Sequence, residues 1–261
     1  MGRRPFNRCR VRGVTMSHYQ RFAKIYDELM QDIPYELYSK RIAEFLGPQM
    51  SRTVVELGCG TGNLLEKLMS YPYQIEGVDI SEEMLSIAST KFTEKKHHIP
   101  LTCMDIRDFD YPKQVDAFIL AVDVVNYLLE EDEIASLFET LYQFLNEDGC
   151  VVFDSHTLQK MASLHEGSPY TFENENLAYI WYAEKNQQHD MVESDLTFFV
   201  KNEDDRLFHR FHETHIQRGY STEFLTNVLL AVGFKIETVV TSLETMTFEE
   251  NAERVYFFAR K

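Results

Sequence analysis

Glycines and a carboxylate occur together near residue 56 in an order that suits ligand binding. The β-branched run Thr53–Leu57 includes Glu56, and residues 64–69 favour a helix. Between them three glycines stand at alternate positions: Gly58, Gly60 and Gly62. Glycine adopts positive φ and lets a ligand approach the backbone, and the first N–H groups of the following helix face that ligand. This strand, loop and helix predict a site for a nucleotide-like ligand.

The spacing of the glycines separates two classes of cofactor. Dinucleotide-binding loops read G-x-G-x-x-G, whereas this chain reads G-x-G-x-G with Glu56 two residues ahead. The shorter spacing fits a cofactor without a pyrophosphate, and an NAD-dependent oxidoreductase is the alternative. The stretch resembles motif I of the class I S-adenosylmethionine (SAM) methyltransferases, E-x-G-x-G-x-G. The resemblance implies that Glu56 and the loop, including Cys59, bind SAM. No histidine or other base flanks Cys59, so a small filler is favoured over a nucleophile at this position.

The ends of the next two strands carry further carboxylates. Residues 74–79 predict a strand that ends at Asp79, whose carboxylate can accept hydrogen bonds from both hydroxyls of a ribose. Ile80 and Met84 are placed to flank an adenine, and core packing is an equal alternative for Met84. Residues 100–104 predict a third strand. There the resemblance implies that Asp105 accepts a bond from the adenine amino group and that the backbone N–H of Ile106 donates to the ring.

An aromatic segment precedes the glycine loop in the sequence. Residues 22–27 resemble the N-terminal segment of small-molecule members of the same family, which often ends in Tyr-Asp. The resemblance implies that Tyr26, or else Tyr19, covers the bound cofactor. A sulfonium is a cation, so an aromatic ring beside it gains on the order of 1 kcal/mol of cation–π energy. Ordinary helix packing is the other reading of these tyrosines.

Candidates for the transfer step follow the fourth and fifth predicted strands. The apolar run 117–122 ends at Asp123, and the segment that includes Asn126 and Tyr127 resembles the family's motif IV, which borders sulfonium and substrate. Asp123 is therefore expected to contact both the cofactor and the acceptor. After a helix over 131–145 and a turn over 146–149, the strand 150–153 leads to His156. Methyl transfer is an in-line displacement in which a base is optional. His156 is the candidate general base, with a helix-capping role as the alternative.

The order of elements predicts an α/β fold. Strands and helices alternate, as in a doubly wound, Rossmann-like sheet of seven strands, and the last strand (254–259) would pair antiparallel with strand 234–240. Alternating patterns over 177–182, 191–200 and 207–217 predict an inserted antiparallel β lid. We therefore expect a SAM-binding core over residues 16–164 and 218–261, a lid over 165–217 and a disordered basic extension over 1–15.

Composition limits the classes of partner. The 261 residues carry a formal charge of −16, from 26 basic and 42 acidic side chains, so most of the surface repels nucleic acid. The segment after Asp123 also lacks the two prolines of N/D-P-P-Y/F, the motif of nucleic-acid N-methyltransferases. A small-molecule acceptor, or a protein acceptor, is favoured over rRNA or tRNA. A non-catalytic adenosine-binding module is a further alternative, and the oligomeric state is left open.

Several other classes are not indicated. No apolar stretch reaches the roughly 18 residues of a membrane span, and no signal-peptide region is evident, so a cytoplasmic enzyme is expected. The four cysteines form no C-x-x-C pair. In a strand, His209 and His215 share one face while His212 points to the other, so these histidines cannot converge on a metal. No metal site is predicted.

Overall fold

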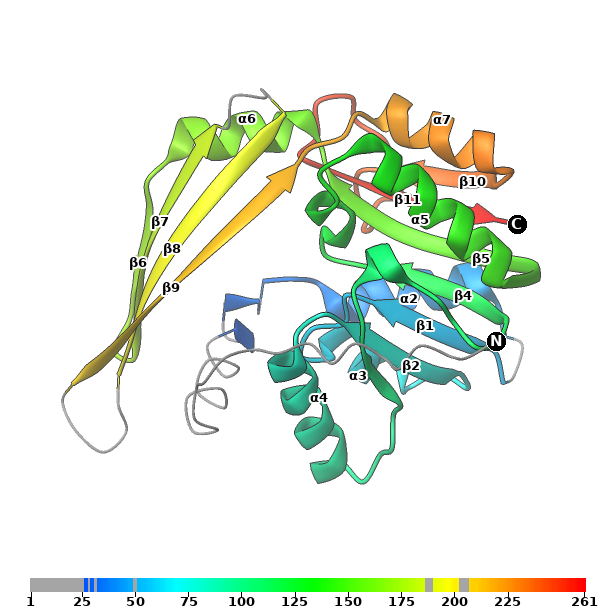
Figure 1. Cartoon of the computed structure of the whole chain (residues 1–261), viewed down its shortest axis with the longest axis horizontal. Coiled ribbons are helices and arrows are strands. Elements are labelled where there is room, and N and C mark those ends of the chain that lie inside the picture. Colours follow the sequence, from blue (N-terminus) through cyan, green and yellow to red (C-terminus); the bar gives the residue numbers. More distant parts are fainter. Residues whose placement is uncertain (1–25, 28, 31, 49–50, 186–189, 202–206) are drawn as a thin grey trace, which may run out of the picture. The chain divides into compact units, whose positions relative to one another are not determined.

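The computed structural model describes residues 26–27, 29–30, 32–48, 51–185, 190–201 and 207–261 (Figure 1). The predicted extension over 1–15 and Tyr19 lie outside the described residues. The strands form a seven-stranded sheet in the order β10-β11-β5-β4-β1-β2-β3 and a separate four-stranded sheet in the order β6-β7-β8-β9. This is the predicted Rossmann-like sheet with an antiparallel insert. The chain divides into two compact units, one up to Ile119 and one from Leu120.

The first unit alternates strands and helices. Its elements are α2 (Tyr35–Leu46), β1 (Thr53–Leu57), α3 (Asn63–Leu68), β2 (Gln74–Asp79), α4 (Glu82–Glu94), β3 (Leu101–Cys103), the 3₁₀ turn η1 (Ile106–Asp108) and β4 (Val115–Leu120), which ends at the boundary. β1 pairs parallel with β2 and β4, and β2 pairs parallel with β3. The predicted strand, glycine loop and helix are thus confirmed. Ser81 caps α4 by accepting a hydrogen bond from the Met84 N–H at 3.2 Å, again as its sequence position suggests.

The second unit contains the remaining elements. They are η2 (Val124–Tyr127), α5 (Glu131–Phe144), β5 (Leu145–His156), α6 (Leu158–Gly167), β6 (Tyr170–Glu173), β7 (Leu177–Lys185), β8 (Met191–Lys201), β9 (Phe208–Arg218), α7 (Thr222–Val232), β10 (Lys235–Val240) and β11 (Arg254–Arg260). β11 pairs antiparallel with both β5 and β10. The reversed last strand and its hairpin partner are therefore as predicted.

The fourth strand ends earlier than predicted. β4 stops at Leu120, and Val122 and Asp123 have positive φ angles of 62° and 55°. The N–H groups of these two residues donate to the two carboxylate oxygens of Asp154, at 2.6 and 3.0 Å. An apolar run alone predicts a continuing strand, but a buried carboxylate offers those N–H groups better partners than another strand would.

The predicted turn over residues 146–149 was wrong. β5 starts directly after α5, at Leu145, and runs through Asp154 and Ser155 to His156. Asp148 has a φ of 62°, so the polar residues mark an irregularity within the strand instead of a separate loop. His156 consequently lies at the end of the strand and pairs with Arg254 of β11.

The inserted sheet has one more strand than predicted, and a helix precedes it. β6 to β9 span residues 170–218, and α6 lies over the start of the region predicted as β. Met161 and Leu164 of α6 pack on Ala183 and Val192, near one end of the sheet (Figure 1). An aromatic row crosses all four strands in register: Phe172, Tyr179, Phe198 and Phe211. That this sheet acts as a lid stays a prediction.

Among the helices that the structure describes, none is both long and apolar enough to cross a membrane.

Candidate functional site

The first residues of the glycine loop are held by hydrogen bonds to the end of β2. Gly58, Gly60 and Gly62 have φ angles of 73°, 52° and 79°, which side chains with a Cβ rarely adopt. The N–H groups of Gly58 and Cys59 donate to the carbonyl of Val78 at 2.8 and 3.0 Å. The N–H of Gly60 donates to Asp79 Oδ2 at 2.7 Å. The loop is therefore held in one open conformation beside the end of β2.

Two carboxyl groups lie beside this loop. Glu56 is 4% exposed, and its Oε2 has no hydrogen-bond partner among the described residues. Burial raises the pKa of Glu56 well above its ordinary value, and the charge of Asp79 adds to this effect. Burial also raises the pKa of Asp79, although N–H groups of Ser81 and Gly60 oppose the shift. A buried and a half-buried carboxyl group side by side favour a ligand with a positive charge and hydrogen-bond donors.

Asp79 keeps capacity for a ligand. Its Oδ1 accepts the Ser81 N–H at 2.8 Å and its Oδ2 accepts the Gly60 N–H. Each carboxylate oxygen has a second lone pair, so two hydroxyl groups of a ribose remain acceptable partners. Ile80, the next residue, is a large apolar side chain that is 53% exposed. An exposed isoleucine beside a carboxylate suits one face of an adenine.

The other residues predicted for the adenine lie on α4 and η1. Met84 is half-buried in α4, and Ile106 is half-buried at the start of η1. Asp105 caps η1 by accepting the Arg107 N–H at 2.9 Å, and it also accepts a bond from Arg107 Nε at 3.0 Å. These bonds to Arg107 hold the pKa of Asp105 below its ordinary value. An adenine amino group would share this carboxylate with Arg107, a partner that the sequence pattern did not indicate.

Cys59 has the surroundings of a filler. It is buried, and burial together with the charges of Glu56 and Asp79 raises the pKa of its thiol. A Cβ added to Gly77 would lie 2.8 Å from its sulfur, so the thiol occupies the space that the glycine leaves. A neutral, enclosed thiol is a poor nucleophile.

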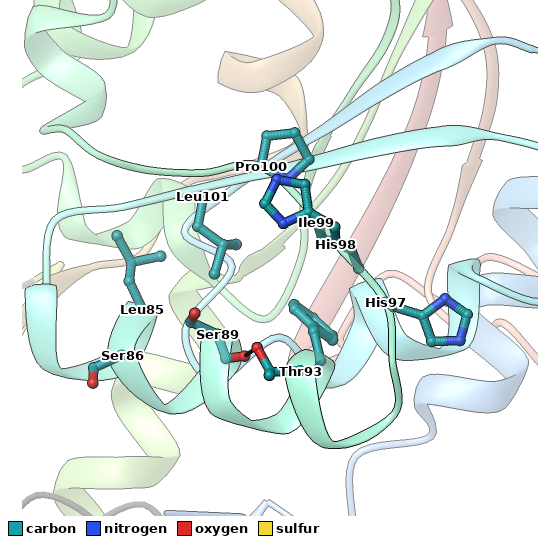
Figure 2. Close-up of a pocket in the computed structure, with 10 residues that line it drawn as sticks. Leu85, Ser86, Ser89, Thr93, His97, His98, Ile99, Pro100 and Leu101 are labelled. Carbon is teal, nitrogen blue, oxygen red and sulfur yellow. Dashed lines mark hydrogen bonds between the residues drawn. The ribbon is translucent and has the colours of Figure 1, made fainter.

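A cavity elsewhere in the first unit is not this site. It has a volume of about 520 Å³ and lies between α4 and the segment His97–Leu101 (Figure 2). Leu85, Ser89 and Thr93 line it from the helix, and no residue predicted to bind the cofactor contributes to it.

The second unit brings Asp123 and His156 together with Arg254, whose side chain is 22% exposed. Arg254 Nη2 donates to Asp123 Oδ1 at 2.9 Å, and Nη1 bonds to Asp154, whose side chain is fully buried. Gln217 Nε2 donates to the other oxygen of Asp123 at 2.7 Å. Burial would raise the pKa of Asp123, but His156 and Arg254 beside it, together with hydrogen bonds from Arg254 and Gln217, hold this pKa below its ordinary value. Asp123 is an ionised carboxylate with both oxygens engaged.

His156 is neutral in this cluster. Its Nε2 lies 2.7 Å from Arg254 Nη2, and because arginine only donates, Nε2 must accept. The imidazole proton is then on Nδ1, which is buried without a partner among the described residues. Burial lowers the pKa of His156 to about 4, although Asp123 opposes the shift. A base whose accessible lone pair faces a guanidinium takes up a proton poorly at neutral pH.

The Asn126 side chain forms hydrogen bonds with main-chain groups. Its Nδ2 donates to the carbonyls of His156 and Arg218, at 3.1 and 2.6 Å, and its Oδ1 accepts the His156 N–H at 2.8 Å. These bonds tie η2 to β5 and β9.

Tyr127 lies in a separate, exposed group. Its side chain is 46% exposed, and its Oη is 3.4 Å from Nδ1 of His215 on β9. The other ring nitrogen, Nε2, is 3.1 Å from the carboxylate of Glu213. A carboxylate that holds Nε2–H leaves the lone pair of Nδ1 directed at the tyrosine. The sequence gives no sign of this contact, because there His215 stands in a histidine pattern that suggests only metal binding.

The strand order, with β11 reversed between β5 and β10, and the glycine loop followed by the carboxylate of β2 together define the class: a SAM-dependent methyltransferase with a Rossmann-like fold. A family model described as a methyltransferase domain matches residues 54–149. A protein of Geobacillus sp. (strain WCH70) that is named as a methyltransferase is 32% identical over 246 residues, which cover 93% of this chain and 99% of the relative.

Solved structures of methyltransferases have the same fold. A SAM-dependent methyltransferase from Clostridium acetobutylicum ATCC 824 has a TM-score of 0.84 at 27% identity, with 93% of this chain and 98% of the other covered. CalS10, an amino pentose methyltransferase from Micromonospora echinaspora solved with SAM bound, has a TM-score of 0.68 at 16% identity, with 91% and 96% covered. The chain belongs to the class I SAM-dependent methyltransferase family. The oxidoreductase and the non-catalytic module are thereby set aside.

The described residues fit SAM as the cofactor. The unpartnered oxygen of Glu56, the open glycine loop and the exposed Ile80 offer places for donors, backbone contacts and an apolar ring. When bound, SAM supplies an activated methyl group on a sulfonium. The particular contacts of Tyr26, Glu56, Asp79, Asp105 and Asp123 with it stay predictions.

We expect Asp79→Ala to weaken binding of S-adenosylhomocysteine (SAH), the product form of the cofactor. Loss of hydrogen bonds to a charged group costs about 1.5 kcal/mol or more, which corresponds to at least about a tenfold higher Kd. Isothermal titration calorimetry would measure it. Asp108→Ala is the matched control, because Asp108 is an exposed acid in η1 that is not predicted to bind the cofactor. An unchanged Kd in Asp79→Ala would remove Asp79 from the site.

Proposed function

We propose that this enzyme methylates a nitrogen or oxygen atom of a small-molecule acceptor in the cytoplasm. The observation that carries the proposal is the exposed series Tyr127, His215 and Glu213. An attacking N–H or O–H group loses a proton during transfer, and this series offers a hydroxyl contact, an imidazole acceptor and a carboxylate that stabilises the imidazolium. None of these three side chains requires that the acceptor be a polymer such as RNA or protein.

The charge of the chain supports the same proposal. A formal charge of −16 disfavours RNA or DNA, whose recognition depends on neutralising phosphates. The resemblance in fold to CalS10, whose acceptor is an amino pentose, is compatible with a small acceptor, but at 16% identity it extends only to the fold.

In this proposal the Tyr127 oxygen takes the proton of the acceptor while the Tyr127 hydroxyl proton passes to Nδ1 of His215. Glu213 orients the His215 ring. His156 and Asp123, also predicted as catalytic, instead hold the buried cluster around Arg254, because the lone pair of His156 and both oxygens of Asp123 are engaged there. A general-base role of His156 is the competing assignment.

The proposal is tested with purified enzyme and SAM that carries a labelled methyl group. Three acceptor pools would be compared: a bacterial extract filtered to small molecules, total RNA, and the protein fraction of the same extract. We expect label in the small-molecule pool, with formation of SAH. Label confined to RNA or to protein would contradict the proposal, and so would an absence of label from all three.

Once an acceptor is identified, we expect Tyr127→Phe and His215→Gln to lower kcat by about 100-fold or more, the usual contribution of a general base. Their Kd for SAH should stay unchanged. His212→Gln is the matched control, because His212 lies on the opposite face of β9, beside Asp195. A loss of kcat in His156→Gln with normal turnover in His215→Gln would return the base role to His156.

A further inference from the structure

Three segments of the first unit meet at the carboxylate of Asp27. Thr61 Oγ1 donates to Asp27 Oδ1 at 2.6 Å, and Asn63 Nδ2 donates to the same oxygen at 2.9 Å. Lys91 Nζ donates to Asp27 Oδ2 at 2.9 Å and to Asn63 Oδ1 at 2.6 Å. The four side chains thus form a closed network, which we call the Asp27 clasp.

The clasp joins parts of the chain that are far apart in sequence. Thr61 lies between two glycines of the loop, Asn63 begins α3, and Lys91 lies in the second half of α4. Asp27 comes from the segment before α2. Of the side-chain surfaces, 17% is exposed for Lys91 and 32% for Asp27, so the ion pair is shielded more than one on an open surface. Shielded pairs with several additional hydrogen bonds hold their geometry better than exposed ones.

Tyr26 is the residue that this arrangement positions. It directly precedes Asp27, and its hydroxyl lies 3.9 Å from the point where a Cβ on Gly60 would be. Its carbonyl accepts the Met30 N–H at 2.9 Å, so a backbone hydrogen bond also fixes the Tyr26 main chain. With Asp27 bonded to Thr61 in the loop and to Asn63 directly after it, the neighbouring Tyr26 keeps its hydroxyl beside Gly60.

We propose that Asp27 and Lys91 are positioning residues that hold Tyr26 over the glycine loop and thereby slow the release of the cofactor. Asp27 acts on the loop through Thr61 and Asn63, and Lys91 acts by fixing Asp27. Pre-organising a covering side chain lowers the ordering cost at binding, so the bound state lasts longer. Neither residue needs to touch the cofactor.

The test uses the full chain and SAH, without any acceptor, so its result is independent of the proposed acceptor class. Calorimetry gives the Kd, and displacement of radiolabelled SAH by unlabelled SAH gives the dissociation rate constant. We expect Lys91→Met to raise both by about fivefold to tenfold, within the range of coupling between contacting residues. Lys91→Arg, which retains the charge, should restore most of the parent behaviour.

Lys95→Met is the matched control. Lys95 lies near the end of α4 and pairs with Glu66 of α3, so this variant removes a comparable cross-element pair without touching Asp27. Circular dichroism and Tm for every variant identify any general loss of stability. We expect Lys95→Met to bind SAH as the parent does, even if its Tm falls.

A double-mutant cycle shows whether the clasp works through Tyr26. In a Tyr26→Ala background, Lys91→Met should change the Kd for SAH by less than about twofold, because the side chain that it positions is gone. Its effect on Tm should persist in that background. Additive effects on Kd, or an unchanged Kd in Lys91→Met alone, would overturn the proposal and leave the clasp a purely structural network.

Discussion

An Arg254→Met substitution is expected to lower the free energy of unfolding by about 3–5 kcal/mol, the usual cost of removing one partner from a buried ion pair. The guanidinium bonds to Asp123 and to Asp154, and the Asp154 side chain has no exposed surface. Without it, two carboxylates in one enclosed cluster would face each other uncompensated. Urea denaturation followed by circular dichroism would measure the change.

Arg260→Met provides the comparison on the same strand. The Arg260 side chain is 23% exposed, much as that of Arg254 is at 22%, but its partner at 3.2 Å is Glu237, which is 34% exposed. A pair with a solvated partner contributes about 0–1 kcal/mol. Adding Asp123→Asn to Arg254→Met should recover part of the lost stability, because it removes one of the two unpaired charges. Equal stabilities of the Arg254 and Arg260 variants would contradict the central role of the cluster.

The pH dependence of the free energy of unfolding provides a second test of the Asp123–Arg254 pair. The pKa of Asp123 is lowered in the folded state, so its contribution to stability is complete above its unfolded pKa and is lost as the pH falls. The parent should therefore lose more stability between pH 5 and pH 3, roughly the range in which an unperturbed Asp titrates, than Arg254→Met does.

Gly62→Ala is expected to destabilise the first unit by about 2–4 kcal/mol, from backbone strain and overpacking together. Gly62 has a φ of 79°, and a Cβ there would lie 2.6 Å from Cζ of Phe92 and 3.3 Å from Cβ of Ala88. Phe92 is 1% exposed, so its ring cannot swing out to make room. The same change would shift the loop and weaken SAH binding.

Phe92→Leu in the Gly62→Ala background separates the two causes, because it should relieve the clash and leave the backbone strain. Gly47→Ala shows strain without a clash, since a Cβ there would meet no atom within 4 Å. Gly47 has a ψ of 176°, against 24° for Gly62, a backbone region populated almost only by glycine, so its substitution should cost about 1–3 kcal/mol. If Phe92→Leu restored none of the stability lost in Gly62→Ala, contact with Phe92 would not be what requires glycine at position 62.

Local signals in the sequence placed many elements correctly. α7 spans Thr222–Val232, because Ser221 caps its first turn and Gly233, with a φ of 113°, ends it, and both residues are signals that the sequence shows. β2 runs from Gln74 to Asp79 for a similar reason, since its apolar residues stop at a carboxylate. These features depend on neighbours within a few residues, and so does the glycine loop.

Errors arose where a distant side chain decided the backbone. β4 ends at Leu120 because Asp154 binds the N–H groups of Val122 and Asp123, and no pattern within residues 117–123 signals that carboxylate. α6, over Leu158–Gly167, was not predicted, although Met161 and Leu164 have helical spacing; it lies across the predicted boundary between core and lid at residue 165.

The sequence by itself determined the order of elements, the glycine loop, the carboxylates at the strand ends and, through these, the cofactor class. Only the tertiary structure decided how the side chains around them are used. Arg254 meets Asp123 across 131 positions, and Lys91 meets Asp27 across 64. Periodicity and capping act over one or two turns or strands, whereas a pair of this kind forms only when sheet register and helix packing bring its members together. That register places His156 beside Arg254, a contact that the sequence did not indicate, and its role as a base stays a prediction.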